Sequence, residues 1–273
     1  VEDPQAPPEE RFKSWVEVAG MFDSDTGEEL AVEEGLKRMG DMEYAGDAYK
    51  GPPMAMRAFV RGFTSPDLMH WTQIEKPVAN MPSDGTAGNP NFEPETKTYF
   101  AYIRVHGLAH EEIQGLAHST PEQDYTRRCV GFTRTKDFYN WPPPKLVLFP
   151  DAHDGPQISF YGGHYFPYPG RKGLHCMLVH VYDQISGHVD NQIAFSRDGL
   201  IWNRPQRSPS IRVGPPGSGR NGCVYAQGGP VKLPDGRWAV SFIGGTSLHN
   251  GFHPGMKMPW DGEQMYWARW EPH

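Results

Sequence analysis

The chain consists of short runs in which apolar and polar residues alternate, separated by clusters of Gly, Pro, Asn and Asp. Alternation with a period of two is typical of strands that bury one face, and the intervening residues are typical of turns. A helix-like pattern is confined to the stretch from Ser24 to Arg38, which can equally form a long acidic loop. The pattern predicts strands at 12–19, 58–63, 89–93, 99–104, 129–132, 158–167, 192–195, 223–233 and 238–244.

Three of these runs are followed by one repeated motif, [Ser/Thr]-x-Asp-x-x-x-Trp. The hydroxyl and carboxylate oxygens of such a motif can accept hydrogen bonds from nearby backbone N–H groups, which holds a turn between two strands. The Trp ring is then placed to pack between neighbouring units, where it buries on the order of 150–250 Å². Because every copy is alike, we assign the motif a structural rather than a catalytic role. The copies contain Ser65, Asp67 and Trp71; Thr135, Asp137 and Trp141; and Ser196, Asp198 and Trp202.

The spacing of the motif divides the chain into units. Consecutive motif Trp residues are 70 and 61 positions apart, and the run 264–270 falls where a fourth unit closes. Repetition at a fixed period indicates stacked or radially arranged units, and four-stranded units of this size are propeller blades. Each unit starts with a candidate inner strand, and we place the first of these at 12–19. The sequence therefore predicts an all-β fold, a β-propeller, with residues 1–273 forming a single domain.

Composition supports this fold class and narrows the partners. The 273 residues include 31 Gly and 27 Pro, which suits many turns. A net charge of −7 without a basic stripe argues against nucleic acid, and the absence of an apolar run of about 20 residues argues against a membrane-spanning helix. The three cysteines show no C-x-x-C spacing, so we expect small buried side chains rather than a thiol metal site.

Several segments resemble a known group of proteins. The opening 3–13, the run 196–205 and the segment 222–249 are similar to bacterial proteins related to the N-terminal propeller of glycoside hydrolases. That resemblance implies a five-bladed propeller of the invertase, levansucrase and arabinanase type, of which four repeats are visible here. It also implies that an upstream blade or half-blade lies outside the given sequence. A glycan-acting bacterial protein of this kind is expected to be secreted or periplasmic.

The ligand site of a propeller lies where the first strands of the blades begin, and glycosidases need two carboxyl groups about 5 to 9.5 Å apart. We therefore take Asp154, Glu93 and Asp84 as the candidate catalytic residues. Asp154 comes first because it precedes the predicted strand 158–167 in a segment rich in acidic and imidazole groups. Glu93 can equally lie in a surface hairpin turn.

Polar and aromatic residues near the other inner strands are candidates for substrate binding. Tyr161 and His164 can stack on a sugar ring, with Gly162 and Gly163 leaving room for close approach. Arg220 suits an anionic substituent such as a uronate or sulfate, although an interblade salt bridge explains it equally well. No metal ligand is predicted, while a calcium or other ion on the propeller axis is left open. The full set is Asn89, Arg104, Tyr161, His164, Arg220, Tyr225, Gln227 and His249.

The first functional hypothesis is a glycoside hydrolase that cleaves a plant, algal or microbial glycan without a cofactor; the oligomeric state is left open. A non-catalytic carbohydrate-binding propeller is the alternative favoured by Asn89, because the resemblance to invertases places their nucleophilic Asp at this position and an amide cannot replace it. A third hypothesis is a glycan lyase with a His or Tyr base, drawing on Tyr161, His164 and His249. A sialidase-like hydrolase is the fourth, since its Asp-box is similar to the repeated motif. A carboxylate pair in the site favours hydrolysis, whereas a His/Tyr/Arg site favours the lyase.

Overall fold

The computed structural model describes residues 1–23, 30–31, 34, 54–80, 88–108, 126–249 and 263–271. Apart from the 3-10 turn η1 (Pro8–Glu10), the elements with bounds in these ranges are strands. The helix-like stretch from Ser24 to Arg38 lies outside them except for residues 30–31 and 34. No helix within the described ranges is both long and apolar enough to cross a bilayer.

The chain forms two compact units. Unit 1 contains Val1–Ala101, His118–Tyr125 and Thr133–Lys145, and unit 2 contains Tyr102–Ala117, Thr126–Phe132 and Leu146–His273. Strands β6 (Thr98–Leu108) and β7 (Thr126–Thr135) contribute residues to both units. The assignment of 1–273 to a single domain stays a prediction.

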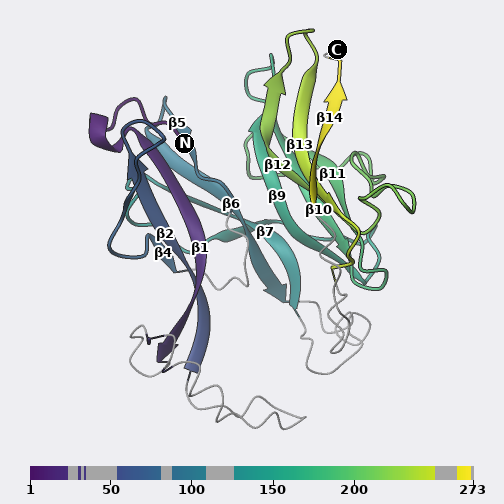
Figure 1. Ribbon diagram of the computed structural model, residues 1–273, viewed down its shortest axis with the longest axis horizontal. Helices are drawn as coiled ribbons and strands as arrows, with labels where there is room; N and C mark the ends of the chain where they lie inside the picture. The colour runs from purple at the N-terminus through teal and green to yellow at the C-terminus, as the bar shows by residue number, and fades with distance from the viewer. Residues whose placement is uncertain are drawn as a thin grey trace. The chain divides into compact units, whose positions relative to one another are not determined.

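Unit 1 is organised around a long antiparallel pair. Strands β1 (Phe12–Asp23) and β2 (Met54–Ser65) pair along their whole length, and the short strands β3 (Thr72–Gln73) and β4 (Ala79–Asn80) both pair with β2. Figure 1 shows β1 and β2 as a twisted ribbon. The twist is expected for a two-stranded ribbon of L-amino acids.

A second sheet has the order β5-β6-β7-β8, with β5 at Asn91–Glu93 and β8 at Lys145–Leu148. Its unit 1 portion places Tyr99 beside aromatic residues from β1 and from the turn after β7. The ring centroids of Trp15 and Trp141 are 4.6 Å apart, and those of Tyr99 and Phe138 are 5.2 Å apart. Burial of these rings is a large apolar contribution to the stability of unit 1.

Unit 2 contains a six-stranded sheet with the order β14-β13-β12-β11-β10-β9 (Figure 1). Its antiparallel halves, β9 to β11 and β12 to β14, are joined by one parallel bridge between Val189 and Cys223. Between them lies a core that includes Phe166, Leu178 and Phe242. The strand bounds are β9 (Ile158–Pro167), β10 (His175–Asp183), β11 (Val189–Ser196), β12 (Cys223–Lys232), β13 (Trp238–Gly245) and β14 (Gln264–Trp270).

The repeated motif forms the turn that its sequence predicts. In the third copy the hydroxyl oxygen of Ser196 accepts the N–H groups of Asp198 and Gly199, and the Asp198 carboxylate accepts those of residues 200 and 201 at 2.8 Å. The Trp202 indole N–H then donates to the carbonyl of Gly199 at 3.1 Å. The same Trp bond occurs in the other two copies. The structural role predicted for the motif is thus confirmed at atomic level.

The Trp rings of the motif differ in burial. Trp141 and Trp202 are 7% and 8% exposed, and each ring packs against an aromatic residue of another strand: Trp15 of β1 for Trp141, and Tyr102 of β6 for Trp202. Trp71 is 39% exposed. Packing of the ring against a second strand therefore holds for the second and third copies.

Strand pairing corrects one expectation. Phe12 pairs with the motif residue Ser65, as His175 pairs with the motif residue Ser196. Strand β1 therefore has the place of β10, the second strand of its group, and the prediction of an inner strand at 12–19 was wrong. The alternating pattern could not reveal this because every strand of a blade alternates alike. The expectation of three small buried cysteines is confirmed, since Cys129, Cys176 and Cys223 are buried and none of the three forms a disulfide.

Candidate functional site

Aromatic and imidazole rings gather at one place in unit 2, on strands β9, β10 and β12 and on the segment after β13. Tyr161 lies at the centre, with ring centroids 4.3 Å from His249 and 5.7 Å from Tyr225. Tyr182 lies 4.6 Å from His249, and His180 lies 5.4 Å from His164 and 5.6 Å from Tyr225. We call the three partly exposed rings of Tyr161, Tyr225 and His249 the platform.

Backbone irregularities aim these side chains. The pairing of β9 with β10 goes from Gly162–His180 directly to Phe160–Val181, so Tyr161 is the extra residue of a β-bulge. The pairing of β12 with β13 is interrupted between Gln227 and Val231, where Gly228 has a φ of +68°. Bulges redirect side chains and are over-represented beside functional sites. Two of them at one cluster single it out from the regular parts of the sheet.

The bulge in β12 also positions an imidazole. The backbone N–H of Gly228 donates to Nδ1 of His164 at 3.2 Å, so Nε2 carries the proton of the neutral ring. The glycine at 163 serves packing rather than ligand approach, because a Cβ there would stand 2.6 Å from the sulfur of Met177. The room that the sequence suggested at this position is already occupied.

The second imidazole, that of His180, makes its hydrogen bond through the other ring nitrogen. Nε2 of His180 lies 3.2 Å from the carbonyl oxygen of Ala226, to which it donates, leaving Nδ1 without a proton. Burial lowers the pKa of His164 to about 4 and that of His180 to about 3. Both rings are therefore neutral near pH 7 and serve as fixed polar groups.

Tyr225 and His249 form a hydrogen-bonded pair. The Tyr225 hydroxyl lies 3.4 Å from Nδ1 of His249. Burial raises the pKa of Tyr225 well above its ordinary value, so its hydroxyl keeps its proton, and the tautomer of His249 sets which group donates. The backbone N–H of His249 donates to the carbonyl of Gly187 at 2.8 Å, which ties this segment to the hairpin between β10 and β11. The pair thus places a hydroxyl and an imidazole beside each other at the platform.

Two arginines support the platform. The guanidinium carbon of Arg104, from β6, lies 4.3 Å from the centroid of the Tyr161 ring, and that of Arg128, from β7, lies 5.6 Å from it. Arg104 also donates to the carbonyl of Tyr161 at 3.4 Å and is 1% exposed. Guanidinium groups at these distances attract the π face of an aromatic ring. The sequence reasoning included Arg104 but missed Arg128.

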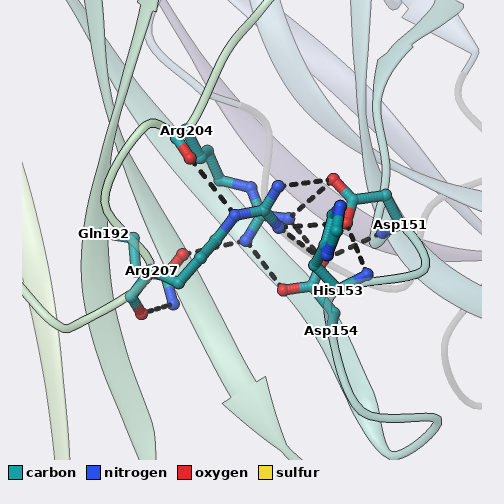
Figure 2. Close-up of polar contacts among 6 residues, drawn as sticks. All are labelled: Asp151, His153, Asp154, Gln192, Arg204 and Arg207. Carbon is teal, nitrogen blue, oxygen red and sulfur yellow. Dashed lines mark hydrogen bonds and ion pairs between the residues drawn. The ribbon is translucent and has the colours of Figure 1, made fainter.

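Asp154, the first catalytic candidate, lies in an ion-pair network shown in Figure 2. Both carboxylate oxygens of Asp154 receive hydrogen bonds from Arg204, and Arg207 donates to one of them at 3.2 Å. The side chains of Asp154 and Arg204 are 5% and 1% exposed. Asp151 accepts a second bond from Arg207 at 2.7 Å, which holds the pKa of Asp151 below its ordinary value. The network ties the segment before β9 to the segment after β11.

This arrangement suits a structural carboxylate better than a catalytic one. Two guanidinium groups already occupy both carboxylate oxygens of Asp154, and its side chain is 5% exposed. A nucleophile needs access to the sugar. A catalytic role for Asp154 stays a prediction, but no contact in Figure 2 supports it.

Two of the remaining candidates belong to unit 1, and the third lies outside the described ranges. Glu93 ends β5 in unit 1, and its carboxylate accepts the N–H of Glu95 at 3.5 Å, as in a hairpin turn. Asn89 precedes β5, and its carbonyl accepts the Asn91 amide at 3.0 Å. Asp84 lies outside the described residues. The structure therefore leaves the role of all three as predictions.

Arg220 and Gln227 belong to unit 2. The guanidinium carbon of Arg220 lies 6.0 Å from the Tyr266 ring, and one of its nitrogens donates to the carbonyl of Arg212 at 2.9 Å. The carbonyl of Gln227 accepts the hydroxyl of Ser241 at 3.0 Å beside the β12 bulge. Of the eight predicted substrate-binding residues, the structure thus gathers five at or next to the platform: Arg104, Tyr161, His164, Tyr225 and His249.

No group of three or more His, Cys, Asp or Glu side chains that could hold a metal lies within the described part of the chain. The ion suggested for the propeller axis stays a prediction.

Comparison with solved structures shows the fold. The chain matches a glycoside hydrolase with a TM-score of 0.53 at 15% identity, over 83% of this chain and 59% of that one. An N-acetylgalactosamine deacetylase from F. plautii, in complex with blood group B trisaccharide, matches with a TM-score of 0.50 at 12% identity, over 78% and 63% of the respective lengths.

No protein-family model matches the sequence, and no curated protein matches it. The chain spans about three-fifths of the length of the glycoside hydrolase structure above. The predicted fold class, all-β and of the propeller type found in glycosidases, is confirmed by these likenesses and by the strands of the structure. The number of blades stays a prediction.

Proposed function

We propose that the protein is carbohydrate-active and binds a sugar ring on the platform formed by Tyr161, Tyr225 and His249. The observation that carries this proposal is the set of partly exposed rings at two β-bulges, with Arg104 behind the central ring. Aromatic faces provide large apolar contact at little entropic cost, which suits the C–H faces of a sugar. The similarity to carbohydrate-active enzymes of the same fold is additional support.

The reaction we propose is cleavage of a glycosidic bond, and two chemistries are compatible with the fold. Hydrolysis is favoured by the likeness to a glycoside hydrolase, and it requires two carboxyl groups flanking the bond. Elimination is favoured by the Tyr225–His249 pair. In elimination a base removes the proton beside a uronate carboxylate, a C=C bond forms and the glycosidic oxygen leaves with a proton.

Binding is tested with a panel of plant, algal and microbial glycans in affinity gel electrophoresis. The variant Tyr161→Ala should weaken binding about tenfold or more, because it removes the central ring of the platform. Tyr139→Ala is the matched control, since Tyr139 is a 40% exposed tyrosine in a turn of unit 1. If Tyr161→Ala binds every glycan as well as the wild-type protein does, the platform is not the sugar site.

The two chemistries differ in their products. Both create reducing ends, but only elimination creates an unsaturated uronate that absorbs ultraviolet light. We therefore measure both signals for each glycan that binds. New reducing ends without ultraviolet absorbance indicate hydrolysis. Binding without either signal across the panel would favour the non-catalytic carbohydrate-binding protein.

A further inference from the structure

The arginines of the platform are placed as a pair. Arg104 and Arg128 come from neighbouring strands β6 and β7, yet both guanidinium groups lie against the ring of Tyr161. Arg128 also lies 5.9 Å from the ring of Tyr182 and, unlike Arg104, is partly exposed. Arg104 is therefore buried against the Tyr161 ring, whereas Arg128 contacts the same ring and keeps part of its surface exposed.

The guanidinium groups of Arg104 and Arg128 supply positive charge at this place, whereas the imidazoles of His164 and His180 do not. His164 and His180 are neutral above about pH 5, because burial lowers their pKa values to about 4 and about 3. The tyrosine hydroxyls keep their protons, since burial raises the pKa values of Tyr182 and Tyr225. The acidic group whose charge acts on Tyr225 is Glu263, which is exposed to solvent.

We propose that the sugar bound on the platform carries an anionic substituent, a carboxylate or a sulfate, which Arg128 binds while Arg104 keeps the Tyr161 ring in place. This inference rests on the proposed function of the platform. A guanidinium donates paired hydrogen bonds to either kind of anion, and these charge-assisted bonds are about twice as strong as neutral ones. A partly enclosed site strengthens them further, because water screens the charges less.

The different burial of Arg104 and Arg128 indicates a different role for each. Arg104 is 1% exposed and donates to the carbonyl of Tyr161, the bulged residue, so it can fix both the ring and the backbone of the bulge. Arg128 has part of its surface accessible to a ligand. We therefore expect Arg104 to act as a positioning residue and Arg128 to contact the anion.

The first test leaves the protein unchanged and varies only the charge of the ligand. One pair is a polyuronate and the same polymer with its carboxyl groups reduced, and a second pair is a sulfated galactan and its desulfated form. Wild-type protein should bind the charged member of at least one pair about 10- to 100-fold more tightly. The pair that shows the preference identifies carboxylate or sulfate. The preference should shrink as salt is added.

The second test changes the arginine. Arg128→Gln should abolish the preference, so that the charged polymer binds no more tightly than the neutral polymer does to the same variant. Arg197→Gln is the control, because Arg197 is an exposed arginine in the repeated turn of unit 2. Tyr161→Ala should weaken binding of both polymers, which separates loss of the platform from loss of the anion contact.

The outcomes distinguish the two proposals. Equal binding of charged and neutral polymers that Tyr161→Ala weakens would overturn the anionic inference and leave the platform as a sugar site. A charge preference that survives in Arg128→Gln would overturn the role of Arg128. Failure of all polymers to bind, charged or neutral, would overturn the proposed function and this inference with it.

Discussion

Replacement of Asp154 by Asn tests whether this carboxylate is structural. Asn is close to Asp in size but removes the negative charge between Arg204 and Arg207 (Figure 2). Arg204 is 1% exposed, so its guanidinium would stay buried without that countercharge. Removing one partner of a buried ion pair costs about 3–5 kcal/mol of unfolding free energy.

The expected loss lies near the lower end of that range. In the variant, Arg204 would still donate to the Gln192 side chain at 2.8 Å and lie over the ring of Phe160 at 4.4 Å. Those contacts offset part of the cost, so we expect a loss of about 3 kcal/mol. Urea unfolding followed by circular dichroism measures it. The slope of unfolding free energy against urea concentration is compared as well, because a changed slope would indicate a change in the compactness of the native or unfolded state.

The control is Asp151→Asn. Asp151 is 40% exposed, and its ion pairs with Arg207 at 2.7 Å and with Arg204 at 3.6 Å should together contribute less than the Asp154 pair does, about 1 kcal/mol. The double variant Asp154→Asn/Arg204→Met should recover part of the loss, because it removes the buried cation as well. The reasoning is refuted if Asp154→Asn unfolds like the wild-type protein. If such a stable variant also loses glycan cleavage, Asp154 is catalytic after all.

Three further predictions concern stability. His164 and His180 have folded pKa values of about 4 and about 3, below the ordinary 6.5, so the unfolded state binds more protons and unfolding free energy should fall as pH drops from about 6.5 toward 4. The loss of unfolding free energy between pH 7 and pH 5 should be on the order of 3 kcal/mol in the wild-type protein and about half of that in His164→Gln. A flat pH profile of unfolding free energy over this window would contradict the lowered pKa values of the two histidines. Gly199→Ala should cost at least about 1 kcal/mol in thermal unfolding, since Gly199 has a φ of +73° and a Cβ there meets a tyrosine hydroxyl at 2.7 Å; an unchanged midpoint would refute the turn geometry. Trp141→Ala should cost about 3–5 kcal/mol and Trp71→Ala clearly less, because their exposures are 7% and 39%; equal losses in calorimetry would argue against burial as the cause.

Some features of the fold follow from local sequence alone. The strand predicted at 158–167 coincides with β9, and the runs at 223–233 and 238–244 differ from β12 and β13 by one residue at an end. The repeated turns are equally local. Their Ser or Thr, Asp and Trp bond to backbone atoms within four positions, so the order of residues suffices to specify them.

The candidate site was only partly predictable. Tyr161, His164 and Tyr225 were found because they lie near the start of predicted inner strands. Arg128 was missed because its strand β7 and the strand β9 of Tyr161 belong to different sheets, and only the tertiary fold brings the two side chains together. The consecutive arginines 127 and 128 carried a weak signal, since neighbours in a strand point to opposite faces.

Residue type alone could not show whether an ionisable side chain is buried or paired with a distant partner. Asp154 was a reasonable catalytic candidate in a segment of acidic and imidazole residues, but its environment depends on Arg204 and Arg207, which lie 50 and 53 positions further on in the sequence. The imidazoles of His164 and His180 were equally ambiguous until burial lowered their pKa values. The sequence by itself determined many of the strands, the repeated turns and the fold class, because these depend on periodicity and short-range hydrogen bonds. Only the tertiary structure decided which polar groups are satisfied by distant partners and which lie at the platform, because desolvation and ion pairing arise between strands far apart in the sequence.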